Sequence, residues 1–183
     1  MKWLLATRRI FRVATPGSFA WNYTKTMAQT TILWGLFLFA IPAVLAGFED
    51  DHWDLPTLGE SRALAVAGFV VFGSLGLWAG VIIAKIGRGT PLPLDAAPVL
   101  AIAGPYRYVR NPMAISAPLQ AISVSFWFDS TTVLLYGILA GFLWHIVIRP
   151  PEELDLEERF GDDYVRYRQN VRCWIPTFPG FDL

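Results

Sequence analysis

Residues 27–48 read MAQTTILWGLFLFAIPAVLAGF and contain no charged side chain. A helix rises 1.5 Å per residue, so about twenty residues are needed to cross about 30 Å of hydrocarbon. A second uncharged run of the same kind covers residues 63–84. Of the 183 residues, 54% are hydrophobic and 16% are charged. Because the apolar residues concentrate in long runs, the sequence predicts an integral membrane protein built from helices rather than a soluble domain.

A helical hairpin is expected over residues 112–148, where Asp129 is the only charged residue. Asp129 and Ser130 lie in a short polar turn, and either side chain can cap the helix that follows. The alternative is one long buried helix, which Pro118 and Asp129 would interrupt. We therefore predict an all-α polytopic membrane bundle, a single domain over residues 1–183, with about four spans at 27–48, 63–84, 112–128 and 130–148. The span at 112–128 is at the short end for a full crossing.

Charge in the loops predicts the orientation of the chain. The segment before the first span carries Lys and Arg and no acidic residue, the next loop is mostly acidic, and the loop before the hairpin is again basic. Since Lys and Arg near span ends are retained in the cytoplasm, we expect both termini there. Residues 1–26 are predicted to include an interfacial helix on anionic headgroups, and residues 149–183 to form a cytoplasmic segment with a second interfacial helix.

Several functions find no support in the composition. The formal net charge of zero gives no indication of nucleic-acid binding. Cys173 is the only cysteine, so an intrachain disulfide or a cysteine-based metal cluster is not possible. Cys173 itself is expected to pack at the interface beside Trp174. No metal site is predicted.

Two regions on the predicted cytoplasmic side carry unusual residues. The first, residues 87–112, is too rich in Pro and Gly for a continuous helix. Irregular backbone at a membrane edge must satisfy its own polar groups or line a hydrated cavity, so this region is either a pocket wall or a plain connecting loop. Its Tyr and Arg side chains, which offer stacking faces and anion-binding forks, favour a pocket.

The second region begins at residue 149. Pro151 suits the first position of a new helix, where Glu152 and Glu153 would lie in the first turn as ordinary capping residues. Gly161 is expected to interrupt that helix. Together the two regions offer carboxylates, arginines, an amide and tyrosines, which suit a ligand with both charges and an aromatic ring. S-adenosylmethionine is such a ligand, and a nucleotide is equally compatible.

Two motifs, taken in their order along the chain, resemble those of a known protein family. The first is Gly104-Pro105-Tyr106-Arg107-Tyr108-Val109-Arg110-Asn111-Pro112-Met113. The second follows the hairpin and comprises Glu152-Glu153, Leu156, Phe160-Gly161, Tyr164, Tyr167 and residues 171–176. In this order, the motifs resemble the isoprenylcysteine carboxyl methyltransferase and phospholipid methyltransferase family over residues 87–176.

The resemblance implies a membrane enzyme that transfers a methyl group from S-adenosylmethionine to a lipophilic acceptor. The acceptor would be an isoprenylcysteine-type carboxylate, a phospholipid amine or a small hydrophobic molecule, arriving laterally from the bilayer. The residues implied in catalysis are Arg110, Asn111, Glu152 and Glu153. The residues implied in cofactor binding are Gly104, Pro105, Tyr106, Arg107, Tyr108, Arg110, Asn111, Pro112, Glu152, Glu153 and Tyr164.

Asn111 is a departure from the family pattern, which usually has histidine at this position. An amide can hydrogen-bond a carboxylate or a ribose, but it does not take up a proton near neutral pH. Two other functions remain open. Steroid reductases are similar in this half of the chain and bind NADPH, and a non-catalytic membrane scaffold would bind no cofactor. The sequence leaves the acceptor and the oligomeric state open.

Overall fold

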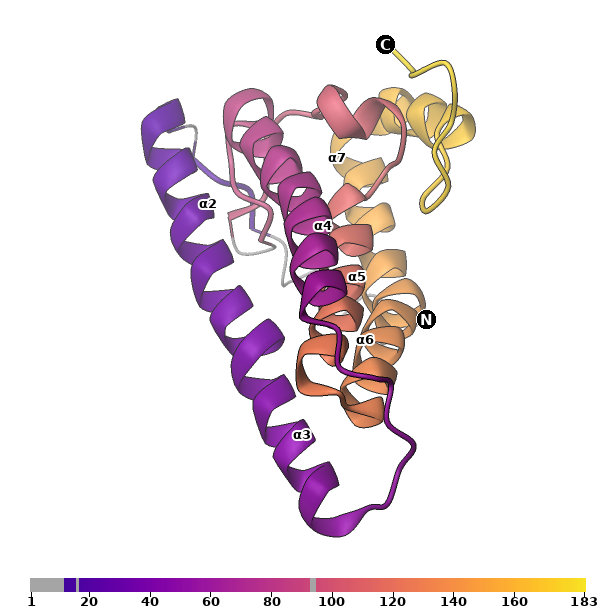
Figure 1. Ribbon diagram of the computed structural model, residues 1–183. Helices are drawn as coiled ribbons and strands as arrows, with labels where there is room; N and C mark the ends of the chain where they lie inside the picture. The colour runs from indigo at the N-terminus through magenta and orange to yellow at the C-terminus, as the bar shows by residue number, and fades with distance from the viewer. Residues whose placement is uncertain (1–11, 16, 93–94) are drawn as a thin grey trace.

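The computed structural model describes residues 12–15, 17–92 and 95–183. These residues form helices joined by loops, with isolated β-bridges that pair Ala96 with Val13 and with Thr90. The predicted all-helical class is confirmed. In Figure 1 one long rod leans away from a group of helices packed side by side, and the C-terminus lies at the wide end of the molecule.

The rod consists of α2 (Phe19–Trp34), the π-helical segment η2 (Gly35–Ala40) and α3 (Ile41–His52). The helices beside it are α4 (Arg62–Ile82), which ends in the π-helical η3 (Ile83–Gly87), and α5 (Pro112–Phe128). A short 3-10 helix, η5 (Gly104–Arg107), lies in the loop between η3 and α5. The chain then continues through α6 (Thr131–Leu143), the π-helical η6 (Trp144–Ile148) and α7 (Arg149–Asn170).

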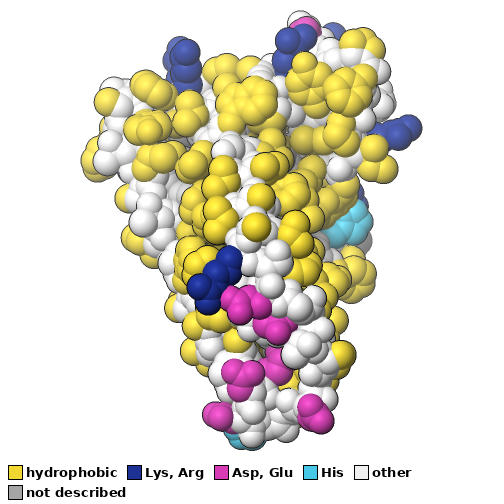
Figure 2. Space-filling model, in the orientation of Figure 1, with side chains coloured by type: hydrophobic (Ala, Val, Ile, Leu, Met, Phe, Trp, Pro, Cys, Tyr) yellow, Lys and Arg dark blue, Asp and Glu magenta, His cyan; other side chains and the backbone are white. Residues whose placement is uncertain are grey.

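Three helices of the described part are long and apolar enough to cross a membrane, namely Phe19–His52, Arg62–Gly87 and Thr131–Asn170. They contain three of the four predicted spans. The fourth forms α5 with the predicted bounds, and its 17 residues cover about 26 Å, less than the hydrocarbon thickness. Asn111 caps its start and Asp129, with φ of 49°, ends it. Figure 2 shows a broad band of hydrophobic side chains above a narrow end where acidic side chains gather.

The start of the first span differs from the prediction. Residues 19–26, placed in an interfacial segment by the sequence, belong to α2, because Ser18 Oγ accepts a hydrogen bond from Trp21 N (3.3 Å) and starts the helix there. Of the remaining residues of that segment, 12–15, 17 and 18 are not helical, and 1–11 and 16 lie outside the described residues.

The prediction that a new helix begins at Pro151 is wrong, because the chain is continuously helical from α6 through η6 into the first part of α7, as far as Phe160. Its π-helical turns directly precede Pro150 and Pro151, where the wider spacing accommodates residues that lack an N–H. From Thr131 to Phe160 the helix has thirty residues and extends about 45 Å, which is long enough to cross a membrane, and the charged residues of α7 follow the apolar residues 131–148. The predicted interruption at Gly161 is confirmed by its non-helical backbone (φ 54°, ψ −132°).

The hairpin turn between α5 and α6 is held by Glu49, which the sequence places in an acidic outer loop. Glu49 instead lies in α3 with a side chain that is 6% exposed. Its carboxylate accepts hydrogen bonds from Ser130 Oγ, Thr131 N (3.1 Å) and Thr132 N (2.9 Å). Ser130 also caps α6, as one of the two predicted alternatives, by accepting from Val133 N (3.1 Å). These bonds fix the rod to the hairpin at one end.

Small residues let α4 and α5 approach closely. A Cβ added to Gly76 would lie 2.5 Å from Ser116 Oγ. That hydroxyl donates to Phe72 O (2.7 Å) and accepts from Gln120 Nε2 (2.9 Å), so it is held on both sides. The interface therefore has no room for a larger residue at position 76.

Gly76→Ala is expected to destabilise the protein by about 1–3 kcal/mol, because the new methyl group displaces Ser116 from its hydrogen bonds. Thermal unfolding in detergent measures this as a lower Tm. Gly47→Ala in α3 is the matched control, since nothing lies within 4 Å of a Cβ there. Its Tm should stay the same or rise, because alanine is the better helix former. Equal Tm values for the two variants would contradict the close packing of α4 on α5.

Candidate functional site

A cavity of about 520 Å³, within the range of small-molecule sites, lies between the rod, the hairpin, α7 and the loop that joins η3 to α5. Its lining divides into two parts. The polar end consists of Arg110, Asn111, Arg149, Glu152, Glu153 and Arg159. The apolar arm consists of Leu33, Trp34, Phe37, Leu38, Ala117, Pro118, Ala121, Tyr136 and Ala140.

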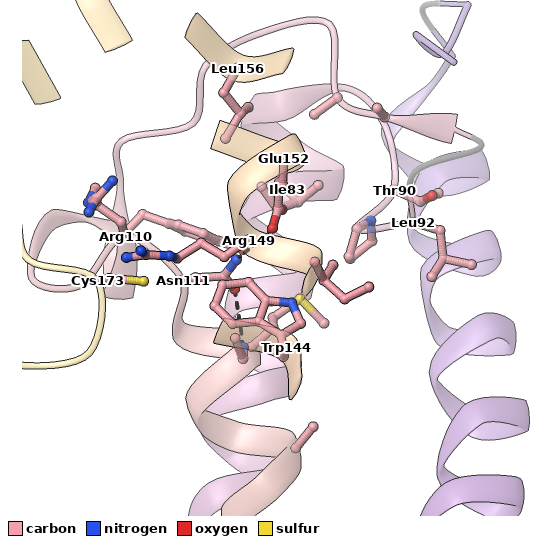
Figure 3. Close-up of a pocket in the computed structure, with 18 of the residues that line it drawn as sticks. Ile83, Thr90, Leu92, Arg110, Asn111, Trp144, Arg149, Glu152, Leu156 and Cys173 are labelled. Atoms are coloured by element: carbon pink, nitrogen blue, oxygen red, sulfur yellow. Dashed lines mark hydrogen bonds between the residues drawn. The ribbon is translucent and has the colours of Figure 1, made fainter. Parts of the chain in front are cut away.

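The loop between η3 and α5 forms one wall of this cavity, with Thr90 and Leu92 among the residues that line it (Figure 3). Two ion-pairing side chains hold the loop in place. Lys25 of α2 pairs with Asp95, and Arg159 of α7 donates to Ala97 O (2.7 Å). Of the two interpretations that the sequence left open, pocket wall and plain connection, the structure confirms the pocket wall.

Contacts at the polar end join the start of α5 to the start of α7. Arg110 Nη1 donates to Glu153 Oε1 (2.6 Å), and the two side chains are 12% and 19% exposed. Asn111 Nδ2 donates to Glu152 Oε2 (3.3 Å), while Asn111 Oδ1 accepts from Ala114 N (3.1 Å) and caps α5. The structure therefore brings together the two sequence regions that were predicted to form a site.

Two arginines at the polar end keep unused hydrogen-bond donors. Within the described residues, the Nε atoms of Arg110 and Arg149 are buried without a hydrogen-bond partner. Both residues line the cavity, so their guanidinium groups place positive charge at its polar end. Figure 3 shows Arg110, Arg149 and Asn111 gathered on one side of the cavity, with Glu152 nearby. This side is suited to a carboxylate.

The pKa of the Glu152 side chain is unusually high for a carboxyl group. Burial, followed by the charges of Glu153 and Asp155, raises its pKa to about 7, although Arg159 acts in the opposite direction. Near neutral pH the side chain is therefore divided between the acid and the carboxylate. Burial also raises the pKa of Tyr164, so its phenol stays protonated and is not a base.

The predicted site residues fall into two groups. Those that line the cavity are Tyr106, Arg110, Asn111, Glu152, Glu153 and Tyr164. The others, Gly104, Pro105, Arg107, Tyr108 and Pro112, are not among the lining residues, and their geometry gives no support for contact with a cofactor. Gly104, with φ of 55°, packs so closely on α4 that a Cβ would lie 3.0 Å from Trp78 Nε1.

Arg107 and Tyr108 instead contact residues 171–182, which we name the C-terminal strap. Arg107 pairs with Asp182, and the Tyr108 ring lies 5.4 Å from that of Phe178. Backbone hydrogen bonds complete the contact, among them Thr177 N to Tyr108 O (2.8 Å).

The strap adds a residue to the cavity that sequence reasoning missed. Arg110 N donates to Arg172 O (3.0 Å), which places the neighbouring Cys173 in the cavity wall rather than at the interface alone. Burial raises the pKa of its thiol, so Cys173 is not an activated nucleophile. The placement of Cys173 depends on a backbone contact, for which side-chain patterns give no signal. Tyr167, which belongs to the second motif but was not among the predicted site residues, also lines the cavity, and its hydroxyl donates to Tyr106 O (2.6 Å).

Comparison with known proteins agrees with this geometry. The family model described as phospholipid methyltransferase matches residues 65–163, more than half of the chain. The matched range contains all residues of the polar end and the whole hairpin. No curated protein matches the chain. The chain belongs to the phospholipid methyltransferase family.

Proposed function

We propose that this protein transfers a methyl group from S-adenosylmethionine to a lipophilic acceptor in the membrane. One observation carries the proposal. The polar end, with its unused arginine donors and its carboxylates, opens into an apolar arm that runs between the rod and the hairpin. Membership of the phospholipid methyltransferase family supports methyl transfer as the reaction.

The residues of the polar end fit S-adenosylmethionine. The guanidinium groups of Arg110 and Arg149 suit its carboxylate, and Glu152 suits its ammonium group. Tyr106 and Tyr164, which line the same cavity, offer aromatic surface for the adenine.

A polyanionic cofactor such as NADPH fits less well. Arg110 and Arg159 already pair with Glu153 and Asp155, so much of their positive charge is neutralised within the protein. This balance favours a ligand with both charges over one with several phosphates, and it disfavours the reductase alternative.

Bound S-adenosylmethionine supplies a methyl group on an activated sulfonium, and the acceptor's lone pair forms the new bond to carbon as the carbon–sulfur pair returns to sulfur. The residues of the cavity would exclude water and align donor and acceptor, which transfer requires at about 3–3.5 Å between the reacting atoms. If the acceptor is an amine, Glu152 or Glu153, whichever carboxylate the donor's ammonium group leaves free, would take its proton, since Asn111 cannot. If the acceptor is a carboxylate, no proton is lost and Arg149 orients it.

Access to the two parts of the cavity follows from the proposed orientation. Asp50 and Asp51 lie in the last turn of α3, and Asp54 lies in the loop after it. This end of the rod is the narrow end of the molecule, where acidic side chains gather, and α7 lies at the opposite end (Figures 1 and 2). Under the rule that basic loops stay inside, this supports cytoplasmic termini and a cytoplasmic donor site. The acceptor would then reach the apolar arm from the bilayer.

Removal of charge at the polar end is expected to weaken donor binding. Glu152→Gln and Arg110→Ala should each lower the affinity for S-adenosylmethionine at least about tenfold, or about 1.4 kcal/mol. Isothermal titration calorimetry on the purified protein measures both. Arg166→Ala is the control, because this arginine is exposed and pairs with Asp163 away from the cavity.

The same titrations separate the alternatives. Unchanged affinity in both variants would remove the proposed site. Binding of NADPH in place of S-adenosylmethionine would indicate the reductase, and binding of neither would indicate the scaffold.

Donor affinity should also depend on pH. Because the pKa of Glu152 is about 7, its side chain is mostly neutral below that pH and mostly a carboxylate above it. Affinity should therefore rise from about pH 6 to about pH 7.5, as the carboxylate forms and attracts the ammonium group. Calorimetry across this range should show a rise in the wild type and little change in Glu152→Gln. The same rise in both proteins would assign the effect to another group.

A further inference from the structure

The first span contains a carbonyl group without a helical partner. In η2, Ile41 N donates to Leu36 O five residues back, which is the π-helical pattern. The carbonyl of Phe37 would next receive the N–H of residue 42, but Pro42 has none. In a lipid environment such a carbonyl needs another donor, because no water reaches it.

Tyr136 of α6 supplies that donor. Its hydroxyl donates to Phe37 O (3.0 Å), so the side chain bridges the hairpin and the rod. Both residues line the apolar arm, and Tyr136 is the lining residue of α6 farthest from Arg149. Thirteen residues of one continuous helix separate the two, a distance of about 20 Å. Tyr136 therefore lies at the end of the arm opposite the polar end.

We propose that Tyr136 determines which acceptors fit, because its ring closes the far end of the apolar arm and limits the length of the acceptor's hydrocarbon chain. The inference rests on the proposed function, in that the reacting group lies at the polar end and its chain extends along the arm.

The apolar arm sets an upper and a lower limit on the length of the acceptor's hydrocarbon chain. A chain that reaches past Tyr136 must displace the ring and break the hydrogen bond to Phe37 O, which leaves that carbonyl unpaired in apolar surroundings. A chain that is too short leaves part of the arm unfilled and loses apolar contact along Leu38, Pro118 and Ala121. The preferred acceptor therefore has a chain that ends at the tyrosine ring.

The experiment compares the products of wild-type and variant proteins from one total lipid extract. The purified protein is incubated with the extract and isotope-labelled S-adenosylmethionine, and mass spectrometry gives the chain lengths of the labelled products. Tyr136→Ala should raise the ratio of long-chain to short-chain products about tenfold. Tyr136→Phe keeps the ring but loses its anchor, so a smaller change in the same direction is expected.

Leu135→Ala is the matched control, since this neighbour on α6 is 56% exposed and does not line the cavity. Its product distribution should equal that of the wild type. Affinity for S-adenosylmethionine, measured in every variant, should not change and shows that each is folded.

An unchanged product distribution in Tyr136→Ala, with normal donor binding, would overturn the inference and leave the proposed function standing. A wild type that neither binds the donor nor labels any lipid would overturn both.

Discussion

The contact between the start of α5 and the start of α7 is the interaction on which the rest of the site depends. The ion pair of Arg110 with Glu153 and the hydrogen bond of Asn111 to Glu152 connect segments that are separated by the whole hairpin. Partly buried charges at a membrane edge are costly unless they are paired, so these contacts have little freedom to rearrange. In this arrangement Arg110 pairs with Glu153 and lines the cavity at the same time.

Departures from α-helical geometry are found where helices border the cavity. Each of the three π-helical segments supplies lining residues, namely Phe37 and Leu38 from η2, Ile83 from η3, and Trp144 and Ile148 from η6. Pro42 and Pro150 follow two of these segments. A π-helical turn leaves backbone groups available and turns side chains away from their regular positions, which explains why such turns are frequent at functional sites. Here they shape the cavity without interrupting the helices that cross the membrane.

The sequence predicted those parts of the fold that depend on local chemistry. The bounds of α5 follow from Asn111, Pro112 and Asp129, which start and stop a helix through their own backbone preferences. Gly161 interrupts α7 for a similar local reason. The continuity of α6 into α7 could not be predicted in this way, because two prolines normally mark a helix boundary and the π-helical turn that accommodates them has no sequence signature.

The positions of the site residues depend more on tertiary contacts than the helix bounds do. The sequence favoured a pocket wall over a plain loop for residues 87–112, and the structure has that wall, but the side chains of residues 104–112 face different partners. Arg110 faces the cavity, whereas Arg107 pairs with Asp182 of the C-terminal strap. The strap is attached largely through backbone hydrogen bonds, which any residue type can make. These backbone bonds place Cys173 in the cavity wall. Glu49 contacts the hairpin turn through hydrogen bonds to residues that are likewise far from it in the sequence.

An experimental structure of the protein in lipid with S-adenosylhomocysteine, the product of the methyl donor, tests the central claim most directly. The account predicts the ligand at the polar end, with its carboxylate against the guanidinium groups of Arg110 and Arg149 and its ammonium group against Glu152. A ligand bound elsewhere, or a polar end that stays empty at saturating concentrations, would contradict it.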